Sequence, residues 1–211
     1  MKQDDFPFKI AITGGIGSGK TSAAEWFAKK GYRVHYADRI GHKFFLNDEI
    51  RKELITNFGK VILAEDNSID RRKLGEIIFK SNENRKTLNK ILHPLIIKEI
   101  EKIIKESKER ILVFEIPLLF ETGMEKLFDL TINIIASKEN KLSRLLERDG
   151  LSQEEIRERI NAQLEESLRK EKADINIFNN GSIENLYETL LKLEILIKAH
   201  CRQSVTDINF H

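Results

Sequence analysis

One glycine-rich stretch constrains the fold of this chain more than any other feature. Residues 14–21 read GGIGSGKT and fit the phosphate-loop pattern G-x-x-x-x-G-K-[ST] in full. The preceding segment, residues 8–13, is short, apolar and β-branched, which predicts a buried strand. Residues 22–30 are mostly helix formers and end before Gly31, a typical helix C-cap. Strand, glycine loop and helix in this order are the setting that the pattern requires.

Such a loop binds phosphate because its backbone N–H groups point inward and the following helix adds its positive end. Lys20 can reach β- and γ-phosphate oxygens, and the hydroxyl of Thr21 can ligate Mg²⁺. The loop therefore predicts a nucleoside triphosphate site, with Thr21 as the metal ligand. The predicted contacts are Gly15, Ile16, Gly17, Ser18, Gly19, Lys20, Thr21 and Ser22.

Bulk composition narrows the class of protein. The chain has 36 Lys and Arg residues against 34 Asp and Glu, and the resulting net charge of +2 argues against nucleic acid as a partner. The only cysteine, Cys201, excludes an intrachain disulfide framework and fits a reducing cytoplasm. Residues 1–8 lack a signal-peptide pattern, and the apolar run 111–120 is too short to span a membrane. We expect a cytoplasmic protein without a membrane partner.

The strand patterns predict an α/β fold. Strands are expected at 8–13, 32–36, 111–116, 130–135 and 175–178, and their apolar character indicates a five-stranded parallel sheet flanked by helices.

Helical patterns fill the segments between these strands. The pattern from residue 39 to residue 108 exceeds what one crossover needs, so we expect a helical insertion, broken at His93-Pro94. Two charged helices near 138–166 indicate either a solvated hairpin or a mobile lid. A last helix begins at Ile183, and the tail from Arg202 is expected to be loose.

Several side chains outside the loop are candidates for chemistry. Asp38 follows the second strand, where it is either a general base or a helix N-cap. Glu115 either orders a metal ion or pairs with a lysine. Arg144 and Arg148 share one helix face at i, i+4, which suits either a triphosphate or surface ion pairs. The apolar segment 117–121 is either core or the wall of a ligand site, and His93 either contacts a ligand or marks a helix break.

An ordered set of motifs over residues 10–190 resembles one family. Besides the phosphate loop, its pieces are Ala37-Asp38, Ile69-Asp70-Arg71 with Leu74 and Phe79, His93-Pro94, the PLLFE segment at 117–121, Arg144 with Arg148-Asp149, Ala162-Gln163, Ala173-Asp174, Asn179 and Gly181. This order is similar to that of dephospho-coenzyme A kinases, which transfer the γ-phosphate of ATP to the ribose 3′-hydroxyl of dephospho-CoA with Mg²⁺.

The resemblance implies a kinase of three parts. Residues 1–43, 109–137 and 167–211 would form the nucleotide-binding core, residues 44–108 the acceptor insertion and residues 138–166 the lid. It implies Asp38 as the base, with Lys20, Arg144 and Arg148 as further catalytic residues, and adds Asn179 to the ATP contacts. The implied acceptor contacts are Asp38, Arg71, His93, Pro117, Leu118, Leu119, Phe120 and Glu121. A monomer or weak homo-oligomer is expected.

The sequence departs from the family at three positions. Tyr36 stands where an aspartate is usual, Thr21 precedes Ser22 in place of the usual Ser-Thr order, and Glu115 stands where an aspartate is common.

Two alternative functions remain. One is a phosphate-loop kinase for another small metabolite or nucleotide. The other is a GTP switch, since residues 38–41 match D-x-x-G, although no N-K-x-D motif occurs.

Overall fold

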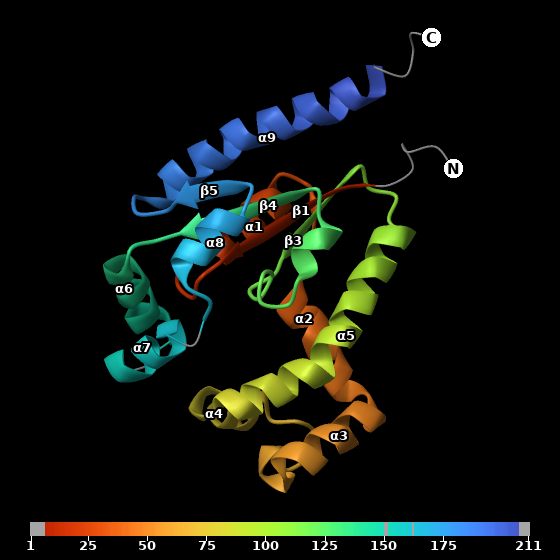
Figure 1. Ribbon diagram of the computed structural model, residues 1–211, viewed down its shortest axis with the longest axis vertical. Helices are drawn as coiled ribbons and strands as arrows, with labels where there is room; N and C mark the ends of the chain where they lie inside the picture. Colours follow the sequence, from red (N-terminus) through yellow and green to blue (C-terminus); the bar gives the residue numbers. More distant parts are fainter. Residues whose placement is uncertain (1–6, 150–151, 162, 207–211) are drawn as a thin grey trace.

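The computed structural model describes residues 7–149, 152–161 and 163–206, and its centre is a five-stranded, all-parallel sheet (Figure 1). The strands run in the spatial order β2-β3-β1-β4-β5, with β1 in the middle. They are β1 (Phe8–Gly14), β2 (Arg33–Tyr36), β3 (Ile111–Glu115), β4 (Leu130–Ile135) and β5 (Ile175–Phe178). The predicted α/β fold with five parallel strands is confirmed.

Two helices cover one face of the sheet, α1 (Lys20–Lys29) and α9 (Ile183–Thr206) (Figure 1). Alternate residues of each strand point to this face, so Ile10 and Ile12 of β1 pack against Phe27 of α1. The apolar stripe of α9 continues through Ile197 to half-buried Cys201, one turn further on. The backbone stays helical beyond this stripe to Thr206, so the tail expected to be loose from Arg202 is helical as far as that residue.

The opposite face is covered by α2 (Ala37–Lys43) and α5 (Asn82–Glu106). Helix α5 passes through Pro94 without ending, so the predicted break there is wrong. Proline removes one helical N–H and kinks a helix, and α5 changes direction near its middle in Figure 1. The helix continues because its apolar residues keep a spacing of four across the proline, at Leu88, Leu92, Ile96 and Ile100.

The predicted helical insertion is present between β2 and β3. Besides α2 and α5 it contains α3 (Asp48–Phe58), α4 (Arg71–Lys80) and the short 3₁₀ turns Phe44–Leu46 and Lys60–Ile62. Its apolar side chains form a cluster of their own, which includes Leu54, Ile62 and Leu74. Another 3₁₀ turn, Met124–Leu127, precedes β4.

Three helices lie between β4 and β5: α6 (Lys138–Asp149), α7 (Gln153–Asn161) and α8 (Glu166–Lys172). A capping box begins α7, since Ser152 Oγ accepts the Glu155 N–H and Glu155 Oε2 accepts the Ser152 N–H. Helix α8 was not predicted. The hairpin is not merely solvated, because Leu145 of α6 and Ile156 of α7 are buried.

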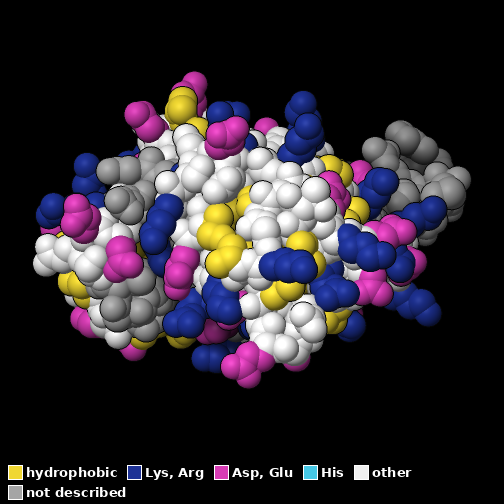
Figure 2. Space-filling model, turned by 90° about the horizontal axis from the view of Figure 1, so that it is seen from below, with side chains coloured by type: hydrophobic (Ala, Val, Ile, Leu, Met, Phe, Trp, Pro, Cys, Tyr) yellow, Lys and Arg dark blue, Asp and Glu magenta, His cyan; other side chains and the backbone are white. Residues whose placement is uncertain are grey.

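The surface agrees with the near-neutral charge balance. Figure 2 shows one face, on which Lys and Arg side chains alternate with Asp and Glu. In the described part of the chain, no helix combines the length and apolar character that crossing a bilayer demands.

Candidate active site

The phosphate loop has the conformation that its glycines predict. Residues 14–21 join β1 to α1, with the backbone of Gly17 and Gly19 at positive φ (+72° and +100°). A Cβ on Gly19 would lie 2.2 Å from Nδ2 of Asn179, so glycine is required there for space as well as for conformation.

Asn179 and Arg144 brace this loop from outside. The buried Nδ2 of Asn179 donates to the carbonyl of Ser18 at 2.8 Å. Arg144 Nη2 donates to the Asn179 carbonyl at 2.9 Å, and its Nη1 lies 3.5 and 3.4 Å from the carbonyl oxygens of Gly17 and Ser18. The structure thus brings both predicted residues to the loop. The side chain of Arg148 lies outside the described residues.

Two cavities meet at Lys20 and Thr21. One, of about 220 Å³, lies beside the loop, and the other, of about 520 Å³, opens toward the insertion. The smaller is lined by Gly17, Gly19, Lys20, Thr21, Ser22, Arg144 and Leu145. The larger is lined by Lys20 and Thr21 together with Ile16, Asp38, Arg71, Pro117 and Leu118, among others. Lys20 and Thr21 therefore border both cavities.

Asp38 lies exposed in the first turn of α2 and lines the larger cavity. The N-cap position of α2 is held by Tyr36, because the helix begins directly at the end of β2. The N-cap interpretation of Asp38 is therefore wrong.

Glu115, the last residue of β3, is buried and accepts a hydrogen bond from the Thr21 hydroxyl at 2.9 Å. Burial raises the pKa of this carboxyl, which the charge of Lys20 and the Thr21 hydrogen bond oppose. Glu115 thus lies in the field of Lys20 and beside Thr21, the predicted metal ligand. In the described residues no three His, Cys, Asp or Glu side chains gather around a possible cation, so a metal here would depend on phosphate and water for most ligands.

The far wall of the larger cavity is basic. Arg71 Nη1 lies 3.0 Å from Nδ1 of His42, and Arg85 and Arg159 line the same space. Burial and the charge of Arg71 lower the pKa of His42, although Asp38 raises it, so neutral His42 can accept the guanidinium N–H. Guanidinium groups in a cavity suit phosphate groups of a ligand.

The PLLFE segment, residues 117–121, contributes both to a ligand cavity and to the core. Pro117 and Leu118 line the larger cavity, whereas Leu119 and Phe120 are buried in the core under α2 and α5. Glu121 is directed toward the segment before α8, where it accepts the Leu164 N–H at 3.3 Å. His93 lies half-buried in α5, burial lowers its pKa, and it is not among the residues that line the cavity.

Lys141 and Arg169 escaped the sequence analysis, and Gln163 entered it only as part of a family motif, without a role. Gln163 accepts the N–H of Ile16, and the cations of Lys141 and Arg169 lie beside Gly15. A signal existed for Lys141, since it precedes Arg144 by three residues and so shares its helix face. None existed for Arg169, because α8 was not predicted.

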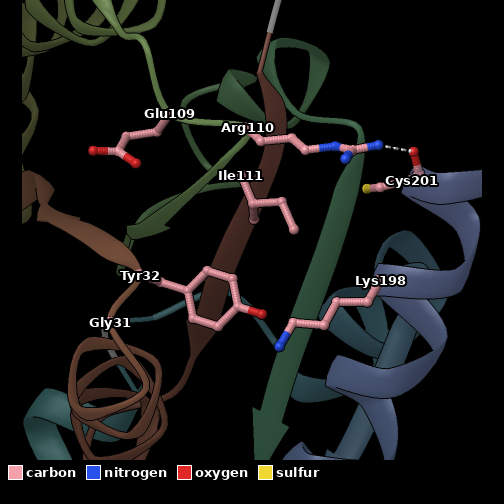
Figure 3. A pocket seen from close by; sticks show the side chains of 7 residues that line it. All are labelled: Gly31, Tyr32, Glu109, Arg110, Ile111, Lys198 and Cys201. Atoms are coloured by element: carbon pink, nitrogen blue, oxygen red, sulfur yellow. Dashed lines mark hydrogen bonds between the residues drawn. The ribbon is translucent and has the colours of Figure 1, made fainter. Parts of the chain in front are cut away.

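A separate cavity of about 340 Å³ lies at the start of β3 (Figure 3). Arg110 reaches from it to the carbonyl of Cys201, while Tyr32 and Lys198 face each other below. Tyr32 donates to the buried Glu194 at 2.8 Å, and Lys198 pairs with the same carboxylate at 2.6 Å. These groups hold α9 against the body of the protein.

This network gives a prediction on stability. Tyr32→Phe is expected to lower the free energy of unfolding by about 1–2 kcal/mol, because it removes a hydrogen bond to a buried charge. Turnover should stay unchanged, since the residue lies away from the phosphate loop. Urea unfolding and a turnover assay on the same protein measure both effects, and an unchanged unfolding midpoint would contradict the prediction.

Comparison with known proteins decides the family. The family model described as Dephospho-CoA kinase matches residues 8–185. A dephospho-CoA kinase of Fusobacterium nucleatum is 36% identical over 179 residues, which are 85% of this chain and 93% of that protein. The chain belongs to the dephospho-CoA kinase family. The fold of the chain is also similar to that of solved structures.

Two solved structures are similar over nearly their whole length. A Thermus thermophilus protein superimposes with a TM-score of 0.78 at 32% identity, covering 90% of this chain and 97% of its own. A dephospho-CoA kinase from Campylobacter jejuni gives 0.59 at 30% identity, covering 90% and 96%. The dephospho-CoA kinase resemblance of the sequence motifs is therefore confirmed, and the GTP-switch alternative is not favoured.

Proposed function

We propose that the protein transfers the γ-phosphate of ATP to the ribose 3′-hydroxyl of dephospho-CoA. The observation that carries this proposal is the cavity of about 520 Å³, which joins Lys20 and Thr21 of the phosphate loop to Asp38 and to the basic wall around Arg71. The acceptor is taken from the names of the relatives, and its diphosphate suits the guanidinium groups of that wall.

In the proposed step, the acceptor hydroxyl oxygen forms a bond to the γ-phosphorus while the bond from that phosphorus to the β–γ bridging oxygen breaks. Asp38 takes the hydroxyl proton, and ADP leaves with the electron pair of the broken bond. Lys20 and the loop N–H groups stabilise the charge on the transferring phosphoryl group. Arg144 holds the loop in shape from its outer side.

The residues present fit Mg²⁺ with ATP. The hydroxyl of Thr21 would bind the metal, and Glu115 at 2.9 Å from that hydroxyl would order it through water or directly. The ion would supply positive charge at the phosphates.

Each of the three parts of the chain has its own role in this proposal. We assign ATP to the core (1–43, 109–137 and 167–211), dephospho-CoA to the insertion 44–108, and closure to the segment 138–166. A cytoplasmic monomer or weak homo-oligomer, with no nucleic-acid partner, is part of the same proposal.

A coupled assay tests the function. ADP release is measured with ATP and dephospho-CoA, and in parallel with adenylate, shikimate and nucleoside acceptors. Turnover only with dephospho-CoA is expected. Faster turnover with another acceptor would favour a different small-molecule kinase, and a preference for GTP without an acceptor would favour a switch protein.

The contacts of Arg144 with the phosphate loop give a prediction on activity. Arg144→Ala is expected to lower turnover at least about tenfold, because the guanidinium spans the carbonyl groups of Gly17, Ser18 and Asn179. Arg144→Lys should restore little, since an ammonium group cannot span that set. Arg157→Ala, on the exposed side of α7, is the matched control. Equal turnover in the Arg144→Ala and Arg157→Ala proteins would reject this role.

A further inference from the structure

Gln163 lies where the phosphate loop meets the larger cavity. Its Oε1 accepts the Ile16 backbone N–H at 2.8 Å, and the residue lines the cavity beside Lys20 and Thr21. Because a backbone N–H can only donate, the carboxamide oxygen must be the atom that faces the loop. The orientation of the carboxamide is thereby fixed, and its two Nε2 donors are bonded to no acceptor within the described residues.

The position of Gln163 is held by its neighbour in sequence. The N–H of Leu164 is bonded to Glu121 Oε1 at 3.3 Å, and its carbonyl accepts Arg169 Nη1 at 2.5 Å. Arg169 is only 4% exposed and lies 4.0 Å from the same Glu121 oxygen. Both backbone groups of Leu164 are thus hydrogen-bonded. These bonds preorganise the side chain of Gln163, the preceding residue.

The corner of the loop that Gln163 touches holds two buried cations, each beside a carboxylate. A Cβ on Gly15 would lie 3.3 Å from Arg169 Nη2, 3.4 Å from Gln163 Oε1 and 3.5 Å from Lys141 Nζ. Both cations are buried, and Lys141 pairs with Glu166 while the Nε of Arg169 has no hydrogen-bond partner in the described structure. A water-poor corner in which the Arg169 Nε–H has no acceptor and the Gln163 donors are oriented favours a group that accepts hydrogen bonds, such as a phosphoryl oxygen.

We propose that Gln163 is a catalytic residue, whose Nε2 donates a hydrogen bond to the γ-phosphoryl group during transfer while Oε1 stays on the Ile16 N–H. This inference rests on the proposed kinase function. In this role, the loop orients the carboxamide of Gln163. The carboxamide in turn adds hydrogen-bond donors to those of the loop, on the acceptor side of the cavity.

Two substitutions separate this role from a purely structural one. Gln163→Glu keeps the oxygen that accepts the Ile16 N–H but loses both donors and places a negative charge near the γ-phosphate. Gln163→Leu loses the acceptor as well. Matched controls are Gln153→Glu and Gln153→Leu, on the exposed start of α7. Turnover with ATP and dephospho-CoA, ADP affinity by calorimetry, and melting temperature are measured for each.

Turnover is expected to fall about 10²-fold in both Gln163 variants, as for loss of one preorganised donor, while ADP affinity stays within about twofold because ADP lacks the γ-phosphate. A residue that only shapes the loop predicts near-normal turnover for Gln163→Glu, or parallel losses of turnover and ADP affinity, and either result overturns the inference. An inactive wild-type protein would reject the proposed function and this inference with it. An active wild type with an active Gln163→Glu protein rejects the inference alone.

Discussion

An Asp38→Asn protein is expected to bind ATP as the wild type does and to turn over at least about two orders of magnitude more slowly. A ribose hydroxyl is a weak nucleophile at neutral pH, and asparagine keeps the size of aspartate while removing its basic oxygen. The nearest alternative base, Glu115, is buried and already accepts the Thr21 hydroxyl. Tyr36, at the end of β2, supplies no carboxylate.

The structure provides a matched control for this substitution. Asp48 also lies in the first turn of a helix, α3, so Asp48→Asn loses the same favourable interaction with a helix dipole. Only the Asp38 variant should lose turnover. ATP affinity, melting temperature and turnover are compared for the two proteins. Retention of more than about a tenth of wild-type turnover by Asp38→Asn would show that another group takes the proton.

A Lys20→Ala protein is expected to lose about 3–4 kcal/mol of transition-state stabilisation, because the substitution removes a charge directed at the transferring phosphoryl group. Folding should survive, since Glu115, whose pKa Lys20 lowers, can take up a proton when that charge is gone. Lys29→Ala, in the last turn of the same helix, is the control. Turnover and circular dichroism measure the two effects. Wild-type turnover by a folded Lys20→Ala protein would contradict the assigned role of the loop.

The sheet and the phosphate loop were predictable because their signals are local. Residues 14–21 carry a contiguous pattern, and each buried strand is a short apolar run between helix-forming segments. Composition alone could not have placed Asp38 near Thr21. The two residues line the same cavity although β3 lies between β2 and β1, a strand order that no local pattern reveals.

The parts of the site that were missed depend on contacts between distant segments. Ile16 and Gln163 meet across most of the chain, and the motif that contains Gln163 gives it neither a role nor a partner. The partition of the PLLFE segment into cavity wall and core was equally invisible, because an apolar pattern does not tell which side chains face a ligand. The continuity of α5 was readable in its four-residue spacing, but the proline argued more strongly for a break.

The packing of α2 on α5 constrains how the enzyme can close. A Cβ on Gly41 of α2 would lie 3.1 Å from Cδ1 of Ile96, so the two helices meet with little free space, and close-packed interfaces of this kind deform poorly. Helix α5 contributes Leu88 and Asn89 to the larger cavity, and α2 carries Asp38. In the proposed reaction, a rigid-body swing of the insertion would therefore move the acceptor alcohol and Asp38 together, and their separation would not depend on how far the site closes.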